Sequence, residues 1–376
     1  MCSKQTPLSE RLQSSLQKHS HYDYFEGKND SISGQCMEMC SARERIEREK
    51  TRRLHPFEVI ESTENTKWPK ADQLLTIKEY SRPAAGKQEV NTSELRPPHV
   101  LIQTVQHLVC KVMTRTDHPW TKIYNFVFDR LRAVRQDLVI QRAAGWECTQ
   151  ILEHCVCFHI YSAYRLCRAP VSEFEPKINM DHARECLKRL LVIYQLQDCK
   201  QSDAQHRARV QMEALYVMFN LGSFDAMMHS LSLPRNIQQS PNVKCAQALS
   251  SAYLKGNFIR IKKLATGLNA IEMCCLHIHL REIQCRALKT MTTAYNSRNL
   301  RFPTPRLANW LMFDSTQEAE DFCRHYGLDV ADGKVQFLKG ALKEDQKAPQ
   351  TSFWETYAGC KLEVLTIPEV IQGSVR

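Results

Sequence analysis

The chain has 376 residues, of which 43% are apolar, and this is enough for a sizeable core in one elongated domain or in two domains. Such a composition excludes a disordered protein. The 51 Lys and Arg residues outnumber the 41 Asp and Glu residues, and the net charge of +10 suits an acidic partner without distinguishing nucleic acid from protein. Glycine is scarce, and helix-forming residues fill the middle of the chain, which indicates an α-helical fold.

The sixteen cysteines are scattered through apolar stretches and are not spaced as a disulfide framework. Because residues 1–15 lack an apolar signal core, we expect reduced thiols in an intracellular protein. No run of about 18 consecutive apolar residues occurs, so the sequence predicts no membrane span and no membrane partner.

Residues 1–33 are polar and predict a flexible N-terminal arm. They precede a Cys-containing motif, Gly34 to Ser41, and a run dense in Arg and Glu that ends at Arg53. Ser41 followed by Glu44 fits a capping box, so a helix should begin there. Because Ile46 is almost the only apolar residue of that run, we expect the helix to lie on a surface.

Residues 54–96 have no apolar period, which predicts a segment that wraps over a body instead of forming one. Together with residues 34–53 they make a predicted second region, 34–96. The apolar side chains expected to anchor the wrapping segment are Phe57, Trp68, Leu74, Leu75 and Tyr80.

From Pro97 to residue 300 the pattern changes to a series of helices separated by Pro, Gly and Asn breaks. Pairs of helices joined by short loops predict a helical-repeat solenoid, although no strict repeat period is visible. The predicted helices cover residues 99–115, 118–144, 146–168, 180–197, 203–220, 241–255, 257–266 and 269–295.

The helix predicted over 118–144 carries an apolar stripe that includes Val127, Leu131 and Val134. Its other faces are rich in arginine, and two interpretations remain open. An acidic partner docks on the arginines, or Asp129 and Asp137 pair with them internally and the rest is a solvated face.

After Pro303 the order becomes helix, helix and hairpin, which is the order of a winged-helix unit over residues 301–345. Leu328 and Val330 alternate with polar residues before the turn Asp332-Gly333, and Val335 and Phe337 alternate after it. The tail, residues 346–376, is irregular, and its role is not apparent from the sequence.

Several of these motifs together resemble the suppressor-of-actin/GANP family, from residue 34 to about residue 340. They are Gly34-x-Cys36-x-x-Met39-Cys40, Arg96-Pro97 before Val100-Leu101, the run from Asp129 to Gln141, and Tyr253-x-x-Gly256-Asn257-Phe258-x-Arg260. One departure is Ser41, where the family typically has Pro; both residues start helices. The resemblance implies a PCI module, a helical-repeat body that ends in a winged helix. It also implies a structural role for Gly34, Cys36, Met39, Cys40, Glu44, Asp129, Arg130, Arg132, Arg135, Asp137, Gln141, Gly256 and Asn257.

By length the chain is similar to the short, single-domain members of that family, which are linked with centrosome duplication, spindle assembly and mitotic progression. The large members are linked with messenger-RNA export, as scaffolds that hold a second PCI protein and a small acidic subunit. The resemblance therefore implies a non-enzymatic scaffold in the cytoplasm, at the centrosome and on the spindle. A nuclear, nucleic-acid-binding scaffold of an mRNA-export complex is the alternative.

No enzyme motif, cofactor site or small-molecule site is predicted. Cys36 and Cys40 lack the second pair of ligands that zinc requires. His154, Cys155, Cys157 and His159 spread around more than half of a helix, so they cannot all face one metal ion. Cys274, Cys275, His277 and His279 fail in the same way. We therefore predict buried thiols and no metal.

The basic residues offer a candidate docking face, for a phosphate backbone of RNA or DNA or for an acidic protein. No aromatic residues interleave with them, so base stacking is not indicated. We favour protein docking because winged helices of PCI modules more often pair with one another. The residues of this face are Arg132, Arg135, Arg142, Lys255, Arg260, Lys262, Lys263, Lys334, Lys339 and Lys343.

Overall fold

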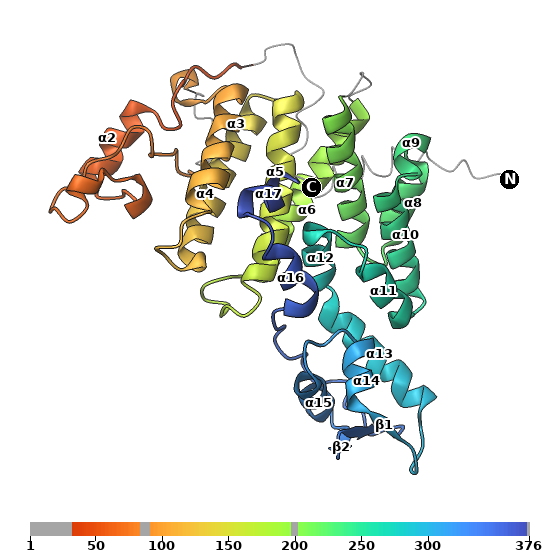
Figure 1. The fold of residues 1–376 in the computed structure, drawn as a ribbon. Coiled ribbons are helices and arrows are strands. Elements are labelled where there is room, and N and C mark those ends of the chain that lie inside the picture. Colours follow the sequence, from red (N-terminus) through yellow and green to blue (C-terminus); the bar gives the residue numbers. More distant parts are fainter. Residues whose placement is uncertain (1–31, 83–90, 197–201, 374–376) are drawn as a thin grey trace. The chain divides into compact units, whose positions relative to one another are not determined.

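The computed structural model describes residues 32–82, 91–196 and 202–373 (Figure 1). The chain divides into two compact units. The N-terminal unit combines the residues up to Val105 with Phe128–Cys148, and the C-terminal unit combines Gln106–Val127 with Thr149–Arg376. Of the predicted flexible arm, residues 1–31 lie outside the described part of the chain.

Among the residues described, the N-terminal unit contains the helix α2 (Ala42–Lys50), most of α3 (Pro98–His107) and the second half of the long helix α4 (Trp120–Ile140). Ser41 caps α2 by accepting from the backbone N–H of Glu44. The Glu44 side chain does not return to residue 41, because it accepts the backbone N–H of Glu79 at 2.9 Å. Only one of the two hydrogen bonds of the predicted capping box is therefore formed. The Glu44 side chain instead joins α2 to the wrapping segment.

The helix α2 lies on a surface, as predicted, and Ile46 is 52% exposed, but Arg48 is fully buried. The helix can turn this charged residue inward because the buried Glu58 carboxylate pairs with it, and the sequence pattern of α2 alone does not show this. The wrapping segment forms short 3₁₀ turns at Pro56–Glu58, Glu61–Thr63 and Thr92–Glu94.

The C-terminal unit is a stack of helices, and the predicted helical-repeat fold is confirmed. Four of its described helices were not predicted: α8 and α9 in the stack, and α16 (Cys360–Leu362) and α17 (Ile367–Gln372) in the tail, which we expected to be irregular. The single helix predicted over 269–295 is interrupted at Ile278 and His279. The stack begins at the last two residues of α3, a π-helical turn (Leu108–Val112) and the first half of α4. It continues with α5 (Trp146–Arg165), α6 (Pro176–Leu196), α7 (Asp203–Phe219), α8 (Phe224–Ser232), α9 (Arg235–Gln238), α10 (Pro241–Leu254), α11 (Phe258–Ala265), α12 (Ala270–His277) and α13 (Leu280–Ala294).

A winged-helix unit follows α13. Its two helices are α14 (Thr304–Trp310) and α15 (Thr316–His325), and the predicted hairpin forms from β2 (Asp329–Ala331) and β3 (Lys334–Gln336). Asp332 and Gly333 both have positive φ, as the tight turn requires. An additional strand, β1 (Arg301–Pro303), pairs with β3 and gives the order β1-β3-β2.

The apolar side chains of the winged helix pack on α13 and form one core. Phe302, Leu307 and Phe322 represent its strand and helices, and Val335 is the buried residue of β3. As the predicted alternation requires, the Val335 side chain of β3 faces this core, and the side chains of Lys334 and Gln336 do not.

The tail packs within the C-terminal unit. Trp354 is almost fully buried, and its indole Nε1 donates to the carbonyl of Met312 at 2.8 Å. The Asp314 carboxylate accepts from the backbone N–H groups of Glu355 and Thr356, where a π-helical turn (Glu355–Gly359) begins. The chain then forms α16 (Cys360–Leu362) and α17 (Ile367–Gln372), and α17 packs on the turn at Leu108–Val112. Within the described ranges, no helix has both the length and the apolar character that crossing a bilayer demands.

Candidate functional site

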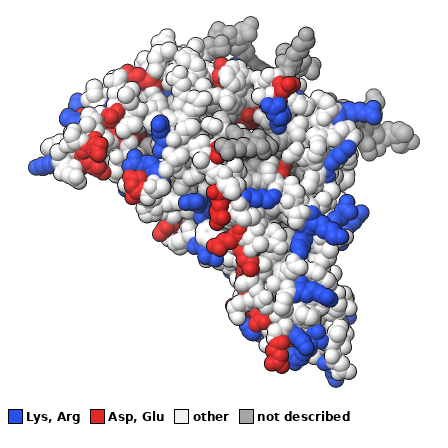
Figure 2. All heavy atoms as spheres, viewed as in Figure 1, with Lys and Arg blue, Asp and Glu red and all other residues white. Residues whose placement is uncertain are grey.

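Several basic side chains of the C-terminal unit lie at and next to the junction of α10 and α11, and others are spread over the same unit (Figure 2). Gly256 adopts the left-handed conformation with φ of 64°, which ends α10 without strain. Asn257 then caps α11, because its side-chain oxygen accepts from the backbone N–H of Arg260 at 2.9 Å. This tight turn places Lys255 and Arg260 on either side of it.

A surface hollow of about 400 Å³ opens at this turn. Its lining residues are Ala248, Ser251, Ala252, Lys255, Asn257 and Arg260. Lys263 is exposed on α11, and Lys262 is half-buried and bonds the side-chain oxygen of Asn309 on α14. The hollow therefore lies beside helices whose exposed charge is positive.

The remaining members of the predicted docking face are divided between the units. Lys334, Lys339 and Lys343 are exposed on the winged helix of the C-terminal unit. Arg142 is exposed in the N-terminal unit. Arg132 is half-buried, and its guanidinium lies 3.8 Å from the centre of the Tyr80 ring. The Arg132 side chain therefore binds the wrapping segment of its own unit.

Arg135 requires a correction. We expected it on an open docking face, but its side chain is only 9% exposed. The predicted helix is present, and its side chains Arg132 and Gln136 contact Tyr80 and Ser81 of the wrapping segment. The sequence shows the arginines of this helix but not how deeply each of them is buried.

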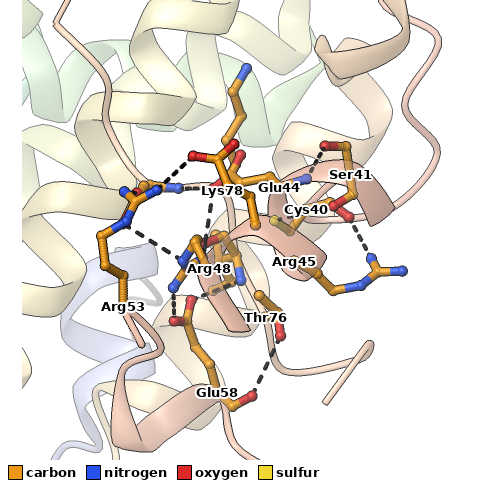
Figure 3. Close-up of polar contacts among 12 residues, drawn as sticks. Cys40, Ser41, Glu44, Arg45, Arg48, Arg53, Glu58, Thr76 and Lys78 are labelled. Carbon is orange, nitrogen blue, oxygen red and sulfur yellow. Dashed lines mark hydrogen bonds and ion pairs between the residues drawn. The ribbon is translucent and has the colours of Figure 1, made fainter. Parts of the chain in front are cut away.

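The most enclosed charges of the N-terminal unit surround Glu58 (Figure 3). Arg48 of α2 reaches the Glu58 carboxylate, and Arg130 of α4 donates to both of its oxygens at 3.1 Å. Arg48 also donates to the carbonyl of Ile77 at 3.0 Å. Burial disfavours the charged guanidinium, but the adjacent Glu58 carboxylate more than offsets this and raises the pKa of Arg48 above its usual value. One buried carboxylate thus joins α2, the wrapping segment and α4.

A second buried carboxylate, Asp137, lies about two turns beyond Arg130 on the same face of α4. Arg96 donates through Nε at 2.8 Å, and Lys78 donates to the other oxygen at 2.8 Å. Both Arg96 and Asp137 are fully buried. One of our interpretations had Asp137 pair with the arginines of its own helix. Asp137 instead pairs with Lys78 and Arg96 of the wrapping segment. Asp129, by contrast, does contact its neighbour Arg130 and also accepts the backbone N–H of Tyr80.

The Gly34 motif is held to the same helix. The Gly34 N–H donates to the side-chain oxygen of Gln141 at 2.9 Å, and the side-chain nitrogen of Gln141 donates to the carbonyl of Arg96 at 2.8 Å. A Cβ atom on Gly34 would come within 2.5 Å of the Leu95 carbonyl oxygen, so only glycine fits. The carbonyl of Met39 accepts from the backbone of Lys78 and the side chain of Arg96. The structure thus brings the family-motif residues of this unit together.

These charges form a clamp and not a ligand site, because Arg48, Glu58, Arg96 and Asp137 have no exposed surface. Removing one partner from such a pair leaves a buried charge uncompensated and costs several kcal/mol. The expected apolar anchors are only partly used, since Phe57 is buried but Trp68 and Leu74 are exposed. Glu58 was not singled out from the sequence, although an acidic residue between the apolar Phe57 and Val59 is a signal for a buried charge.

The cysteines of the family motif are enclosed thiols. Burial raises the pKa of Cys40 to about 12, so this thiol stays protonated at neutral pH and is a poor metal ligand. Burial also raises the pKa of Cys157 to about 12 and lowers the pKa of His154 to about 4. Within the ranges the structure describes, no group of three or more His, Cys, Asp or Glu side chains is arranged to hold a metal ion.

One polar pair lies inside the helical stack. The Tyr194 hydroxyl of α6 donates to Oε1 of Glu153 on α5 at 2.6 Å. Burial raises the pKa of Glu153 to about 7, although the hydrogen bond from Tyr194 opposes the shift. The carboxyl group therefore changes its charge near neutral pH.

Replacing Glu153 by Gln is expected to stabilise the protein at pH 8 and to leave its stability unchanged at pH 4. In the unfolded chain the carboxyl ionises near pH 4.5, and in the folded chain near pH 7, so wild-type stability falls as the pH rises between these values. Gln does not ionise but still accepts from Tyr194, and the gain above pH 7 should be about 2 to 3 kcal/mol. Urea unfolding at both pH values measures it, and equal stabilities at pH 8 would contradict the placement of Glu153.

Comparisons with known proteins identify one family. The SAC3/GANP family model matches residues 39–332, which include the clamp, the helical stack and most of the winged helix. SAC3 family protein 1 of Schizosaccharomyces pombe is 27% identical over 91% of this chain, and protein xmas of Drosophila melanogaster is 28% identical over 80%. SAC3 family protein B of Arabidopsis thaliana is 24% identical over 82%.

These matches cover 35%, 15% and 18% of the three relatives, so the chain spans about a third of their length or less. The matched part is nevertheless most of the present chain. The resemblance noted in the Gly34, Asp129 and Gly256 motifs is therefore confirmed. The chain belongs to the SAC3/GANP family of scaffold-type proteins.

Proposed function

We propose that this protein is a non-enzymatic scaffold that acts in centrosome duplication, spindle assembly and mitotic progression. The observation that carries the proposal is a helical stack that ends in a winged helix with exposed lysines and two strand edges, β1 and β2. Such a unit can pair with the winged helix of a second PCI-type protein, as the family resemblance implies. The titratable side chains of the clamp are paired inside the N-terminal unit, which supports a structural role for them.

The proposed scaffold works in the cytoplasm, at the centrosome and on the spindle. Its partners are a PCI-type protein and a small acidic subunit, and the proposal involves no membrane, cofactor or small-molecule substrate. Apolar edges of the winged helix supply most of the affinity, and the lysines steer the encounter.

A second function is favoured by one specific observation. From Arg235 to Ile271 the sequence contains no Asp or Glu, although Lys and Arg recur in α10 and α11. A positive surface of this kind suits the phosphate backbone of RNA or DNA. The alternative is therefore a nucleic-acid-binding scaffold of a nuclear mRNA-export complex.

The two functions are separated by location and by salt dependence. For the mitotic scaffold we expect a tagged chain at the spindle poles of dividing cells, with a stoichiometric protein partner that survives moderate salt. A nuclear tag, together with RNA affinity that falls steeply as salt increases, would instead establish the export function.

The winged-helix part of the proposal is tested by the double variant Lys334→Glu/Lys339→Glu. We expect loss of the PCI-type partner and an unchanged melting temperature, because both side chains are exposed. Lys111→Glu, an exposed lysine on the turn at Leu108–Val112, is the matched control. Retention of the partner by the double variant would exclude the wing as the docking surface.

A further inference from the structure

One face of α10 carries short side chains in its middle and a lysine at each end. Lys244, Ala248, Ser251, Ala252 and Lys255 follow at helical spacing, so they share this face. Its middle is lined only by the short side chains at 248, 251 and 252, and for this reason the hollow exists. The two lysines are about 16 Å apart along the axis, which is about three turns of a helix.

The cations around this floor have no acidic partner. Within the described part of the chain, Lys244, Lys255, Arg260 and Lys263 form no ion pair, whereas Lys289 and Arg301 of the same unit do. The nearest acidic residue along the sequence is Glu272, which is buried and bound to Asn242 and Asn269. No ion pair among the described residues therefore neutralises these four side chains.

Apolar surface adjoins the charged end of the floor. Leu254, the last residue of α10, directly precedes Lys255 and is 54% exposed. A large exposed apolar side chain next to unpaired cations is typical of a protein interface, in which apolar contacts give affinity and charges give register.

We propose that this face of α10 binds an acidic amphipathic helix of another protein. The short side chains at 248, 251 and 252 let a second helix approach closely, since interaxial distance is set by the side chains at the contact. Acidic residues on the bound helix meet Lys244 at one end and Lys255 and Arg260 at the other. Its apolar residues cover Leu254. This inference rests on the proposed scaffold function and names the chemistry of one partner.

The floor favours a helix over a nucleic-acid strand. Its lining offers methyl and hydroxyl groups and no aromatic ring on which a base could stack. Nucleic-acid binding at this face is accordingly an outcome of the test that would overturn the proposal.

The test is a selection of random 16-residue peptides on the full-length protein, with counter-selection on the double variant Lys255→Glu/Arg260→Glu. We expect enriched peptides with acidic and apolar residues at helical spacing. Their affinity, measured by fluorescence polarisation, should fall about tenfold or more in the double variant. Ser251→Trp, which fills the hollow without changing the charge, should lower the affinity as well.

Lys111→Glu is the charge control and should bind like wild type, and thermal melting verifies that each variant is folded. Peptides without an acidic stripe, equal binding to wild type and double variant, or displacement of the peptides by single-stranded RNA of equal charge would each overturn the proposal. Failure here, with the winged-helix partner still bound, rejects only the α10 site. Retention of that partner by Lys334→Glu/Lys339→Glu would separately exclude the winged helix as its docking surface.

Discussion

Replacing Glu58 by Gln is expected to lower the free energy of unfolding by about 3 to 5 kcal/mol. The change preserves the shape of the side chain but removes the negative charge that lies between Arg48 and Arg130. Both guanidiniums would then be buried with too little compensation, and neither can lose its proton at neutral pH. Urea unfolding of the full chain, followed by circular dichroism, measures the loss.

Glu47→Gln is the matched control for this prediction. Glu47 also pairs with an arginine, Arg53, at 2.9 Å, but both side chains are exposed. Exposed pairs contribute at most about 1 kcal/mol, so this variant should unfold nearly like wild type. If Glu58→Gln were as stable as the control, the clamp would not hold the N-terminal unit together.

The second large effect is expected for Val134→Asp in α4. Val134 is fully buried on the apolar stripe of that helix, and the new carboxylate would have no cation placed for it. Burying an unpaired charge is among the most destabilising single changes, and we expect a loss of more than about 4 kcal/mol. Leu131→Asp should act in the same way, since Leu131 is also buried.

Val139→Asp provides the control within the same helix. Val139 is 42% exposed, so the same substitution there leaves the carboxylate hydrated. We expect a change within about 0.5 kcal/mol. An unaltered melting curve for Val134→Asp would mean that the stripe does not face a core.

Elements with a local cause were predictable. The Asp332-Gly333 turn forms as expected, because both residues tolerate positive φ and the flanking alternation matches a strand. α4 and α10 were also expected, since their apolar residues repeat at helical spacing. In contrast, β1 has three residues and exists through its pairing with β3, so no local pattern announced it.

The candidate site was predictable to a lesser extent. The motif around Gly256 and Asn257 indicated a turn with basic neighbours, and the structure has that turn. Which arginines are exposed was not visible in the sequence. Arg132 and Arg135 occur in the same helical run, yet one stacks on Tyr80 and the other is buried.

The sequence by itself determined the helical class and the order of the main elements, because these follow from local periodicity, caps and turn residues, and its shared motifs indicated the family. Only the tertiary structure decided that Arg48 points inward while Ile46 faces solvent, and that Glu58 and Asp137 bind partners from distant segments. The physical reason is that a charge can be buried only where a compensating charge already lies. The paired residues lie as far apart in the sequence as Glu58 and Arg130, or Arg96 and Asp137, so no local pattern shows which charges will pair.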